Sequence, residues 1–596
     1  MVIPARSTAH ERNAAYLLEQ RLEKIYGIQV DVVADNIKTA GNILSVGATV
    51  YADYDFTAKK TGSYAVTAFD GGVSIIGNGN RGLIDGVFRF LSEFCDYEVY
   101  TKDVIRYTEE KSLCVPKNTK IESTPFFEYR KVDTVSTGDA EYALANSLNS
   151  QIWFSNEEGG VIKYLSLFGH SLTNQFCKRD TYFASHPEYF ALRDGKRVDK
   201  QLCLTNPDVL KIVTEEVLDL LKKSHDPTAD LQIVSLTQDD NEEYCTCDNC
   251  RALDEKNGSH AGTMLTFVNA VADAVKVADP AYKNVAIDTF AYQYTRTCPT
   301  NVVPRDNVII RLCSIECCFG HTIDDENCKE NVLFLQDLNK WSKICDRVYI
   351  WDYINNYSET FLPFADFQVL QRNMQLFYEN GAKGVYEEGN YYMDICNGEF
   401  YELRSYLLCK LMQNPYREDY EELMLDYLTQ VYGPGGTYLK EFIDLVSSRS
   451  VTKTKHLHIR QQPADCLPGI TATEIRKADK LWENAKNAAK TTQQLNEIKR
   501  SELCWQYWKC CRMKGEYSPL RGLYSYMKSH KELYDKIVAL GNTAVGEGAI
   551  KYLRGNSFSI YFLPPTKWES KYDGKLWHKL DPFADWLYER LEELHG

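Results

Sequence analysis

Between residues 129 and 388 the chain alternates short apolar runs with longer amphipathic segments. The apolar runs have the length and the β-branched or aromatic content of strands. They cover residues 129–134, 150–154, 162–169, 231–238, 284–292, 307–314, 347–352 and 382–387. Between them, residues 208–223, 263–277, 332–343 and 367–380 repeat apolar positions at helical spacing. Eight strands that alternate with helices predict an α/β fold, a (β/α)8 barrel of the TIM type.

The two flanks of this region have different patterns. Residues 11–27 predict a helix, residues 28–33, 43–47 and 64–69 predict strands, and a strand, a glycine-rich turn and a helix follow. The turn at residues 77–82 lacks the lysine and hydroxyl of a phosphate-binding loop and the full dinucleotide pattern, so we interpret it as structural. After Gly389 only helices are expected, at residues 398–413, 420–432, 436–447, 472–517, 519–539 and 582–593.

These patterns divide the chain into three predicted domains. Residues 1–108 form a small α/β accessory domain, residues 125–415 the barrel, and residues 416–596 a helical C-terminal domain. The stretch at 115–125 has proline and polar residues without a period, which is typical of a linker.

Composition narrows the classes of partner. A formal net charge of -15 and a pI near 5.4 argue against nucleic acid and anionic membranes, which favour clustered Lys and Arg. The 40 tyrosines and 9 tryptophans suit a glycan-binding cleft, although a tyrosine-rich core would give the same count. The first residues lack the apolar core of a signal peptide, so a cytoplasmic protein is expected, or a secreted or periplasmic one if a leader was removed. Oligomeric state is not predicted.

An acid pair follows the fourth predicted strand. Asp239 and Asp240 end that strand, and the C-terminal strand ends of a barrel are where its active site lies. Adjacent side chains on a strand point to opposite sides, and crowding of carboxyl groups raises at least one pKa. The alternative is a solvated acidic loop, since Glu242 and Glu243 follow directly.

A second acid pair, Glu387 and Glu388, ends the eighth predicted strand. It lies beside Tyr386 and Tyr391. Glycoside hydrolysis typically uses two carboxyl groups that flank the scissile bond. Two acidic pairs at two strand ends therefore predict a catalytic site.

Other strand ends carry aromatic and polar residues that could contact a sugar ring. Packing explains each of them equally well when it is considered alone. The candidate substrate-binding residues are His170, Tyr292, Tyr294, Arg296, Trp351, Asp352, Tyr353, Tyr386 and Tyr391.

The 19 cysteines are scattered, which is typical of reduced thiols rather than of a disulfide framework. Cys245, Cys247 and Cys250 have spacing that could hold zinc, and Cys313, Cys317 and Cys318 form another group. No matching fourth ligand is evident, so a thiol cluster or a disulfide is favoured over zinc. We predict no cofactor and no catalytic metal.

Several motifs in the barrel region resemble one known family. They are HPEYFAL with QLCLTNP, QDDNEEYCTCDNC, FVNAVADAV followed by AYQYTR, IRLCSIECCFGH, YIWDYINNY, GVYEEGNY and FYELRSYLLCKLMQNP. This ordered set resembles the domain of unknown function 4838 family, part of which is classed as glycoside hydrolase family 163, endo-β-N-acetylglucosaminidases acting on complex N-glycans. The N-terminal unit is similar to the accessory domain of α-glucuronidases and β-hexosaminidases.

The resemblance implies a glycan substrate and a retaining, substrate-assisted mechanism. In that scheme the 2-acetamido oxygen of the substrate attacks the anomeric carbon. By residue type and position, Asp239 would polarise the acetamide and Asp240 would be the acid/base. Related members carry an amide at the position of Asp239, which leaves the two roles open.

Two alternatives remain at this stage. An α-glucuronidase-like or other exo-acting glycosidase would use Asp240 as acid and Glu387 or Glu388 as the base of an inverting reaction. Arg296 is the one obvious basic residue at a strand end, which disfavours a uronate substrate. A non-catalytic glycan-binding barrel is disfavoured because both acid pairs are present.

Overall fold

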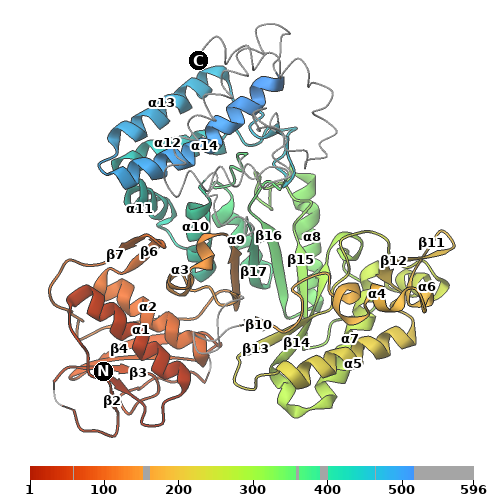
Figure 1. Ribbon diagram of the computed structural model, residues 1–596, viewed down its shortest axis with the longest axis horizontal. Coiled ribbons are helices and arrows are strands. Elements are labelled where there is room, and N and C mark those ends of the chain that lie inside the picture. Colours follow the sequence, from red (N-terminus) through yellow and green to blue (C-terminus); the bar gives the residue numbers. More distant parts are fainter. Residues whose placement is uncertain are drawn as a thin grey trace, which may run out of the picture.

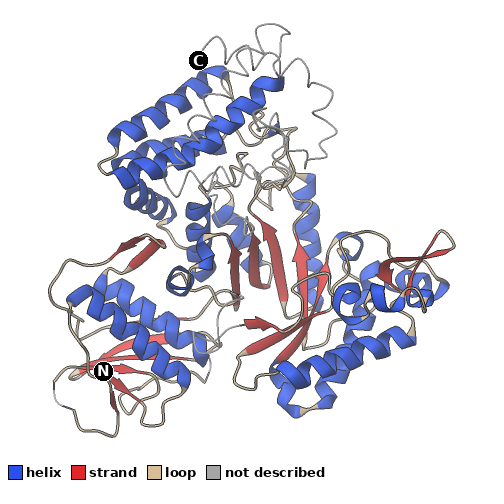
Figure 2. Cartoon of the chain, in the orientation of Figure 1, coloured by secondary structure: helices blue, strands red, loops and turns tan. Residues whose placement is uncertain are grey.

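The computed structural model describes residues 1–515 except for 40, 58, 152–161, 358–361, 390–399 and 463–464. Figure 1 shows an N-terminal α/β unit at the lower left, a barrel with a side lobe at the centre and right, and a group of helices above them. Figure 2 shows that strands form the centre of the barrel and that helices lie around it.

The N-terminal unit is a six-stranded sheet with two helices packed against each other. Its strand order is β2 (Val33–Ala34), β1 (Val2–Ile3), β3 (Ile43–Val46), β5 (Gly72–Gly77), β4 (Tyr64–Phe69) and β8 (Lys120–Ser123). Helix α1 (Ala9–Tyr26) begins with a capping box between Thr8 and Glu11 and ends at Gly27, which has a left-handed conformation. Helix α2 (Gly79–Cys95) packs against β5, and the hairpin of β6 (Glu98–Thr101) and β7 (Val104–Arg106) follows it.

Strand β8 pairs antiparallel with β4 inside the stretch predicted as a linker, so that prediction was wrong for residues 120–123. A four-residue edge strand is too short to give a clear alternating pattern. In the glycine-rich turn, a Cβ atom on Gly77 would lie 2.0 Å from the backbone nitrogen of Leu83. Close packing of helix on strand therefore explains glycine there.

The barrel sheet has seven parallel strands in the described part of the chain. Their order is β10 (Ile162–Tyr164), β13 (Leu231–Ser235), β14 (Val285–Ala291), β15 (Val308–Cys313), β16 (Val348–Tyr353), β17 (Ala382–Glu388) and β9 (Tyr129–Asp133). These correspond to seven of the eight predicted strands, and the predicted α/β barrel is confirmed. The other predicted strand covers residues 150–154, of which 152–154 lie outside the described residues.

Asn149 joins the two ends of this sheet. Its backbone N–H donates to the carbonyl oxygen of Arg130 in β9 at 3.1 Å, and its own carbonyl accepts from the N–H of Ile162 in β10 at 2.9 Å. Backbone hydrogen bonds therefore continue between β9 and β10 at the position where the eighth strand is expected, and the barrel is nearly closed.

Helices cover the outside of the barrel. They are α3 (Ala140–Ala145), α5 (Pro207–Ser224), α7 (His260–Ala278), α8 (Lys329–Ile344), α9 (Leu370–Glu379) and α10 (Tyr401–Gln413). In α5, Val209, Val213, Val217 and Leu221 are buried at four-residue spacing. Helix α7 is long and apolar enough to cross a membrane by length and composition alone, but 61% of the apolar window is buried, as in the core helix of a globular domain.

A lobe beside the barrel contains the hairpin of β11 (Phe190–Arg193) and β12 (Lys196–Leu202) with the short helices α4 (Arg179–Tyr182) and α6 (Asp248–Asn257) (Figure 1). The helices above the barrel are α11 (Tyr420–Tyr432), α12 (Gly436–Ser447), α13 (Ala472–Ala488) and α14 (Thr492–Gly515). Residues 472–517 were predicted as one helix. The helix breaks because Thr491 accepts a hydrogen bond from the N–H of Gln494 at 3.1 Å and so starts α14. The predicted helices at 519–539 and 582–593 lie outside the described residues.

Candidate active site

A cavity of about 410 Å³ lies among residues that end or follow the barrel strands. Asp240 comes from the loop after β13, Tyr292 follows β14, and Glu388 is the last residue of β17. The barrel therefore brings one acid from each predicted pair to a single cavity. Its full lining is Phe168, Gly169, His170, Asp240, Phe290, Tyr292, Cys313, Ile315, Trp351, Tyr353, Tyr357, Glu388, Ile459 and Arg460.

Glu388 has the environment of a proton donor. Burial raises its pKa to about 7, and the neighbouring carboxylates Asp133 and Asp240 add to the increase. The indole N–H of Trp351 donates to Oε2 of Glu388 at 2.7 Å, which moderates that increase because it stabilises the charged form. A carboxyl group with this pKa is substantially protonated at neutral pH, as a general acid needs to be.

Asp240 is exposed and is oriented by two donors. The hydroxyl of Tyr292 donates to Oδ1 at 2.7 Å, and Nε2 of Gln293 donates to the same oxygen at 3.1 Å. Gln293 has a positive φ of 50°, a backbone conformation that few residues adopt. The turn after β14 therefore fixes the position of the Asp240 carboxylate.

Asp239 points away from the cavity and is not among its lining residues. Its carboxylate accepts from Arg179 at 3.0 Å, from Asn174 at 2.9 Å and from the hydroxyl of Thr173. Burial raises its pKa, and these polar contacts oppose the increase. Neighbouring side chains diverge here as alternation predicts, and the sequence-based role of Asp239 as the acetamide-polarising group has no support in this position.

Glu387 also points away from the cavity, and it is buried. It lies with Asp352 and Asp366 in a second, smaller and mostly apolar pocket behind β16 and β17. Within the described residues, neither carboxyl oxygen of Glu387 has a hydrogen-bond partner. Burial raises its pKa well above the usual range, and Asp352 and Asp366 add to the effect. Asp352 accepts from the Ser314 hydroxyl, and burial raises its pKa to about 6.

Aromatic rings form part of the cavity wall over a buried cation. The guanidinium of Arg311 lies 4.5 Å from the ring centres of Phe168 and Phe290 and 5.2 Å from that of Trp351. It pairs with the carboxylate of Asp288 at 2.8 Å inside the barrel. Cation–π contacts and this ion pair hold the three rings in place at the wall of the cavity.

Four of the predicted binding residues line the cavity: His170, Tyr292, Trp351 and Tyr353. His170 has a positive φ of 53°, and its Nδ1 lies 2.7 Å from the carbonyl oxygen of Gln238. This contact fixes the ring at the edge of the cavity.

The other predicted binding residues lie elsewhere. The hydroxyl of Tyr386 donates to Asp133 at 2.9 Å inside the barrel. Tyr294 packs against Tyr244 with ring centres 5.3 Å apart. Arg296 forms ion pairs with Asp337 and Glu316 at 2.8 and 2.9 Å, so its charge is already neutralised. Asp352 belongs to the pocket behind the strands, and Tyr391 lies outside the described residues.

Ile459 and Arg460 were not predicted from the sequence. Both come from the segment between α12 and α13, and both line the cavity. Arg460 is exposed, and among the described residues no carboxylate lies within ion-pair distance of it. No strand or motif precedes this segment, so the pattern of the sequence gives no signal for it.

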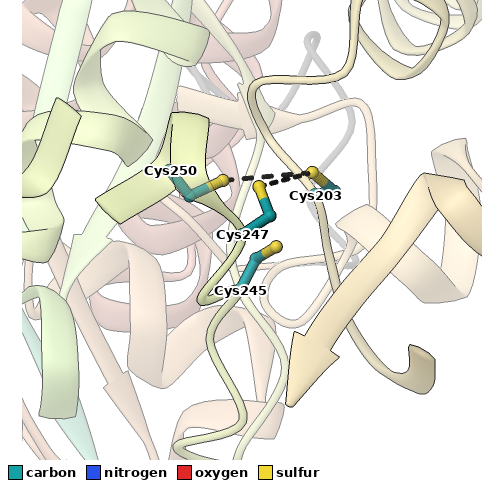
Figure 3. Close-up of side chains that lie close together, drawn as sticks. All are labelled: Cys203, Cys245, Cys247 and Cys250. Atoms are coloured by element: carbon teal, nitrogen blue, oxygen red, sulfur yellow. Dashed lines mark hydrogen bonds between the residues drawn. The ribbon is translucent and has the colours of Figure 1, made fainter. Parts of the chain in front are cut away.

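Two groups of residues outside the cavity have the composition of metal sites. Cys203 joins Cys245, Cys247 and Cys250, so the fourth ligand absent from the local motif comes from the segment after β12 (Figure 3). A second group consists of Cys318, His321, Cys328 and His456. In each group the four ligand atoms lie within 4.8 Å of one another.

Comparison with known proteins agrees with this architecture. A family model described as a domain of unknown function (DUF4838) matches residues 99–444. No curated protein matches the sequence. A family GH115 4-O-methyl-α-glucuronidase with specificity for decorated arabinogalactans aligns over 92% of this chain and 77% of its own, at 10% identity and a TM-score of 0.58.

A GH89 enzyme from Clostridium perfringens, solved with GlcNAc-α-1,4-galactose, aligns over 89% of this chain and 65% of its own. The identity is 9% and the TM-score is 0.48. At 10% identity, the likeness to the GH115 enzyme establishes the fold alone.

Proposed function

We propose that this chain, which belongs to the DUF4838 family by a match over more than half of its length, is a glycoside hydrolase. The observation that carries the proposal is that Asp240 and Glu388 line one aromatic cavity of the barrel. The GH115 4-O-methyl-α-glucuronidase of similar fold is a glycoside hydrolase, which supports this class.

The two acids have environments that suit opposite roles. Glu388, with a pKa of about 7, protonates the leaving oxygen of the glycosidic bond. Asp240, oriented by Tyr292 and Gln293, acts at the anomeric carbon of the substrate. Two carboxyl groups of this kind are what hydrolysis through an oxocarbenium-like transition state requires.

The finer proposal is cleavage of β-linked N-acetylglucosamine with substrate assistance. In this version the acetamide oxygen attacks the anomeric carbon, and Asp240 with the Tyr292 hydroxyl orients the acetamide. Asp239 has no part in it, because its carboxylate is held by Arg179 outside the cavity. Support comes from the family motifs and from the two polar groups on the cavity wall.

A second candidate is a glucuronidase, and Arg460 favours it. A uronate carboxylate needs a cation in the cavity, and Arg460 lines it without an ion-pair partner in the described part of the chain. The residue previously considered for this role, Arg296, is neutralised by two carboxylates. Glu388 and Asp240 would then be the acid and base of an inverting reaction.

A substrate panel with matched variants separates these possibilities. Purified protein is incubated with aryl β-N-acetylglucosaminides, aryl α-glucuronides and N-glycans, and products are identified by mass spectrometry. Arg460→Gln should reduce cleavage of uronates by about tenfold or more if that side chain pairs with their carboxylate, and should leave neutral sugars little changed. Failure to hydrolyse any glycoside, with Asp240→Asn binding glycans as tightly as the wild type, would support a non-catalytic binder and overturn the proposal.

A further inference from the structure

The four cysteines at the side lobe have the arrangement of ligands around one ion. The Sγ atom of Cys203 lies 3.6 Å from that of Cys247 and 3.9 Å from that of Cys250. Four sulfurs bound to zinc at about 2.3 Å in a tetrahedron would lie about 3.8 Å apart. Figure 3 shows the sulfur of Cys203 facing those of Cys247 and Cys250 across the gap between two segments.

A pair of disulfides fits this arrangement less well. A disulfide joins two sulfurs at about 2.05 Å and leaves them out of contact with others. Here Cys203 has two sulfur neighbours at similar distances, and all four sulfurs lie within 4.8 Å of one another. The geometry is that of a shared ion rather than of pairs.

Polar groups around the sulfurs suit thiolate ligands. The backbone N–H of Leu192 donates to Sγ of Cys245 at 3.3 Å, and the hydroxyl of Thr205 lies 3.2 Å from Sγ of Cys250. Such contacts orient the ligands of a metal and stabilise their charge. Three of the four cysteines are buried, so the position is shielded from water.

Few apolar side chains surround the four sulfurs, although the N–H of Thr246 also ties this loop to the hairpin by donating to the carbonyl oxygen of Leu192 at 2.9 Å. The local apolar cluster contains only Ala191, Leu192 and Val198 besides the four cysteines. An apolar cluster of this size contributes little stability by itself. An ion here would fasten the β11–β12 hairpin to the loop that runs from Asp240 to α6.

An independent group of ligands comes from the segment between β15 and α8 and from the segment between α12 and α13. Nδ1 of His321 lies 3.1 Å from Sγ of Cys318, and Nδ1 of His456 lies 3.6 Å from Sγ of Cys328. In a tetrahedral zinc site with two sulfurs and two nitrogens, an S···N edge is about 3.6 Å. His456 belongs to the segment that also carries Arg460, and the N–H of Phe319 donates to the carbonyl of Leu457 at 2.8 Å. An ion would hold this segment over the cavity.

We propose that the chain binds two structural zinc ions, one at Cys203, Cys245, Cys247 and Cys250 and one at Cys318, His321, Cys328 and His456. Each site has four protein ligands and therefore no open position for a reacting water, which is the pattern of structural rather than catalytic zinc. The proposal is independent of the proposed glycosidase activity.

Metal content of the purified full-length chain tests the proposal. Native mass spectrometry and elemental analysis should give two zinc ions per chain. X-ray absorption should give an average of three sulfur and one nitrogen ligands, because one site has four sulfurs and the other has two sulfurs and two nitrogens. Iron in place of zinc, a zinc-free chain with free thiols, or the mass deficit of disulfides among these cysteines would overturn it.

Single variants assign the sites. Cys203→Ser should lose one zinc and leave a spectrum with equal sulfur and nitrogen, whereas His456→Ala should lose the other and leave sulfur alone. Cys298→Ser is the matched control, since Cys298 is a half-buried thiol outside both groups, and it should keep both ions. Two zinc ions retained in Cys203→Ser would contradict the first site. If a variant does not fold, the metal content and the X-ray absorption spectrum of the wild type still test whether two zinc ions are bound.

Discussion

The indole N–H of Trp351 donates a 2.7 Å hydrogen bond to Oε2 of Glu388, from the neighbouring strand of the same barrel. This bond opposes the effect of burial, which raises the pKa of Glu388 to about 7. Removal of the donor should therefore raise that pKa further. We expect Trp351→Phe to shift the alkaline limb of the pH–rate profile to higher pH and to lower kcat by about tenfold, since the acid is also less well positioned.

An alkaline limb at the same pH in Trp351→Phe and the wild type would contradict this role. The measurement is kcat/KM from pH 5 to pH 9 on a single substrate. Circular dichroism of both proteins checks that the loss of the indole has not altered the fold.

The two members of the first acid pair should respond differently to the same substitution. Asp240→Asn removes a carboxylate from the cavity and should lower kcat by about 10²- to 10⁴-fold. Asp239→Asn should keep activity within about tenfold of the wild type, because this side chain lies outside the cavity.

Asp239→Asn should instead lower stability. The substitution weakens the contact with Arg179, which is partly exposed, so we expect a loss of about 1–3 kcal/mol in the free energy of unfolding. Activity assays and urea unfolding of both variants measure the contrast. Equal losses of activity in the two variants would contradict the placement of Asp239.

The acid pairs show how much of the candidate site could be predicted from the sequence. Strand ends and residue types predicted that both acid pairs lie at the barrel mouth, whereas the structure places one residue of each pair, Asp240 and Glu388, in the cavity. Which one faces it depends on where Arg179 and the apolar pocket behind Glu387 lie, and neither follows from local pattern. Arg460, Cys203 and His456 were missed for a related reason, since each reaches its site from a segment far away in the chain.

Tyr292 should matter for activity through Asp240. Its hydroxyl donates to Oδ1 of Asp240 at 2.7 Å. A hydrogen bond to a charged group contributes about 1.5–3 kcal/mol, so Tyr292→Phe should lower kcat/KM by about 10- to 100-fold. Tyr294→Phe is the matched control, because Tyr294 follows the same strand but does not line the cavity. A loss of similar size in the control would indicate a general effect of the loop.

Glu387 should make the protein less stable at alkaline pH. Its pKa is raised well above the usual range, and that of Asp352 is raised to about 6. An acid whose folded-state pKa is raised stabilises the fold below its unfolded-state pKa, and this contribution is lost as pH rises through the folded-state value. The free energy of unfolding should therefore fall from about pH 4 through pH 6 and above.

Glu387→Met removes that dependence, since the surrounding pocket is mostly apolar. We expect it to raise the free energy of unfolding at pH 8 by about 1–3 kcal/mol and to change it little at pH 5. Glu418→Gln, an exposed position, controls for the loss of one negative charge. Urea unfolding at both pH values is the measurement, and destabilisation of Glu387→Met at pH 8 would show that the buried carboxylate makes a stabilising contact.

The central claim is that Glu388 donates the proton in a glycosidase reaction carried out with Asp240. The most direct measurement is kcat/KM against pH for the wild type and Glu388→Gln on one glycoside with a poor leaving group. We predict that kcat/KM of the wild type falls as pH rises through about 7. The variant should be slower by about 10²-fold or more and should not show this decrease. A variant as active as the wild type, or a wild-type rate that rises through pH 7 and stays high, would contradict it.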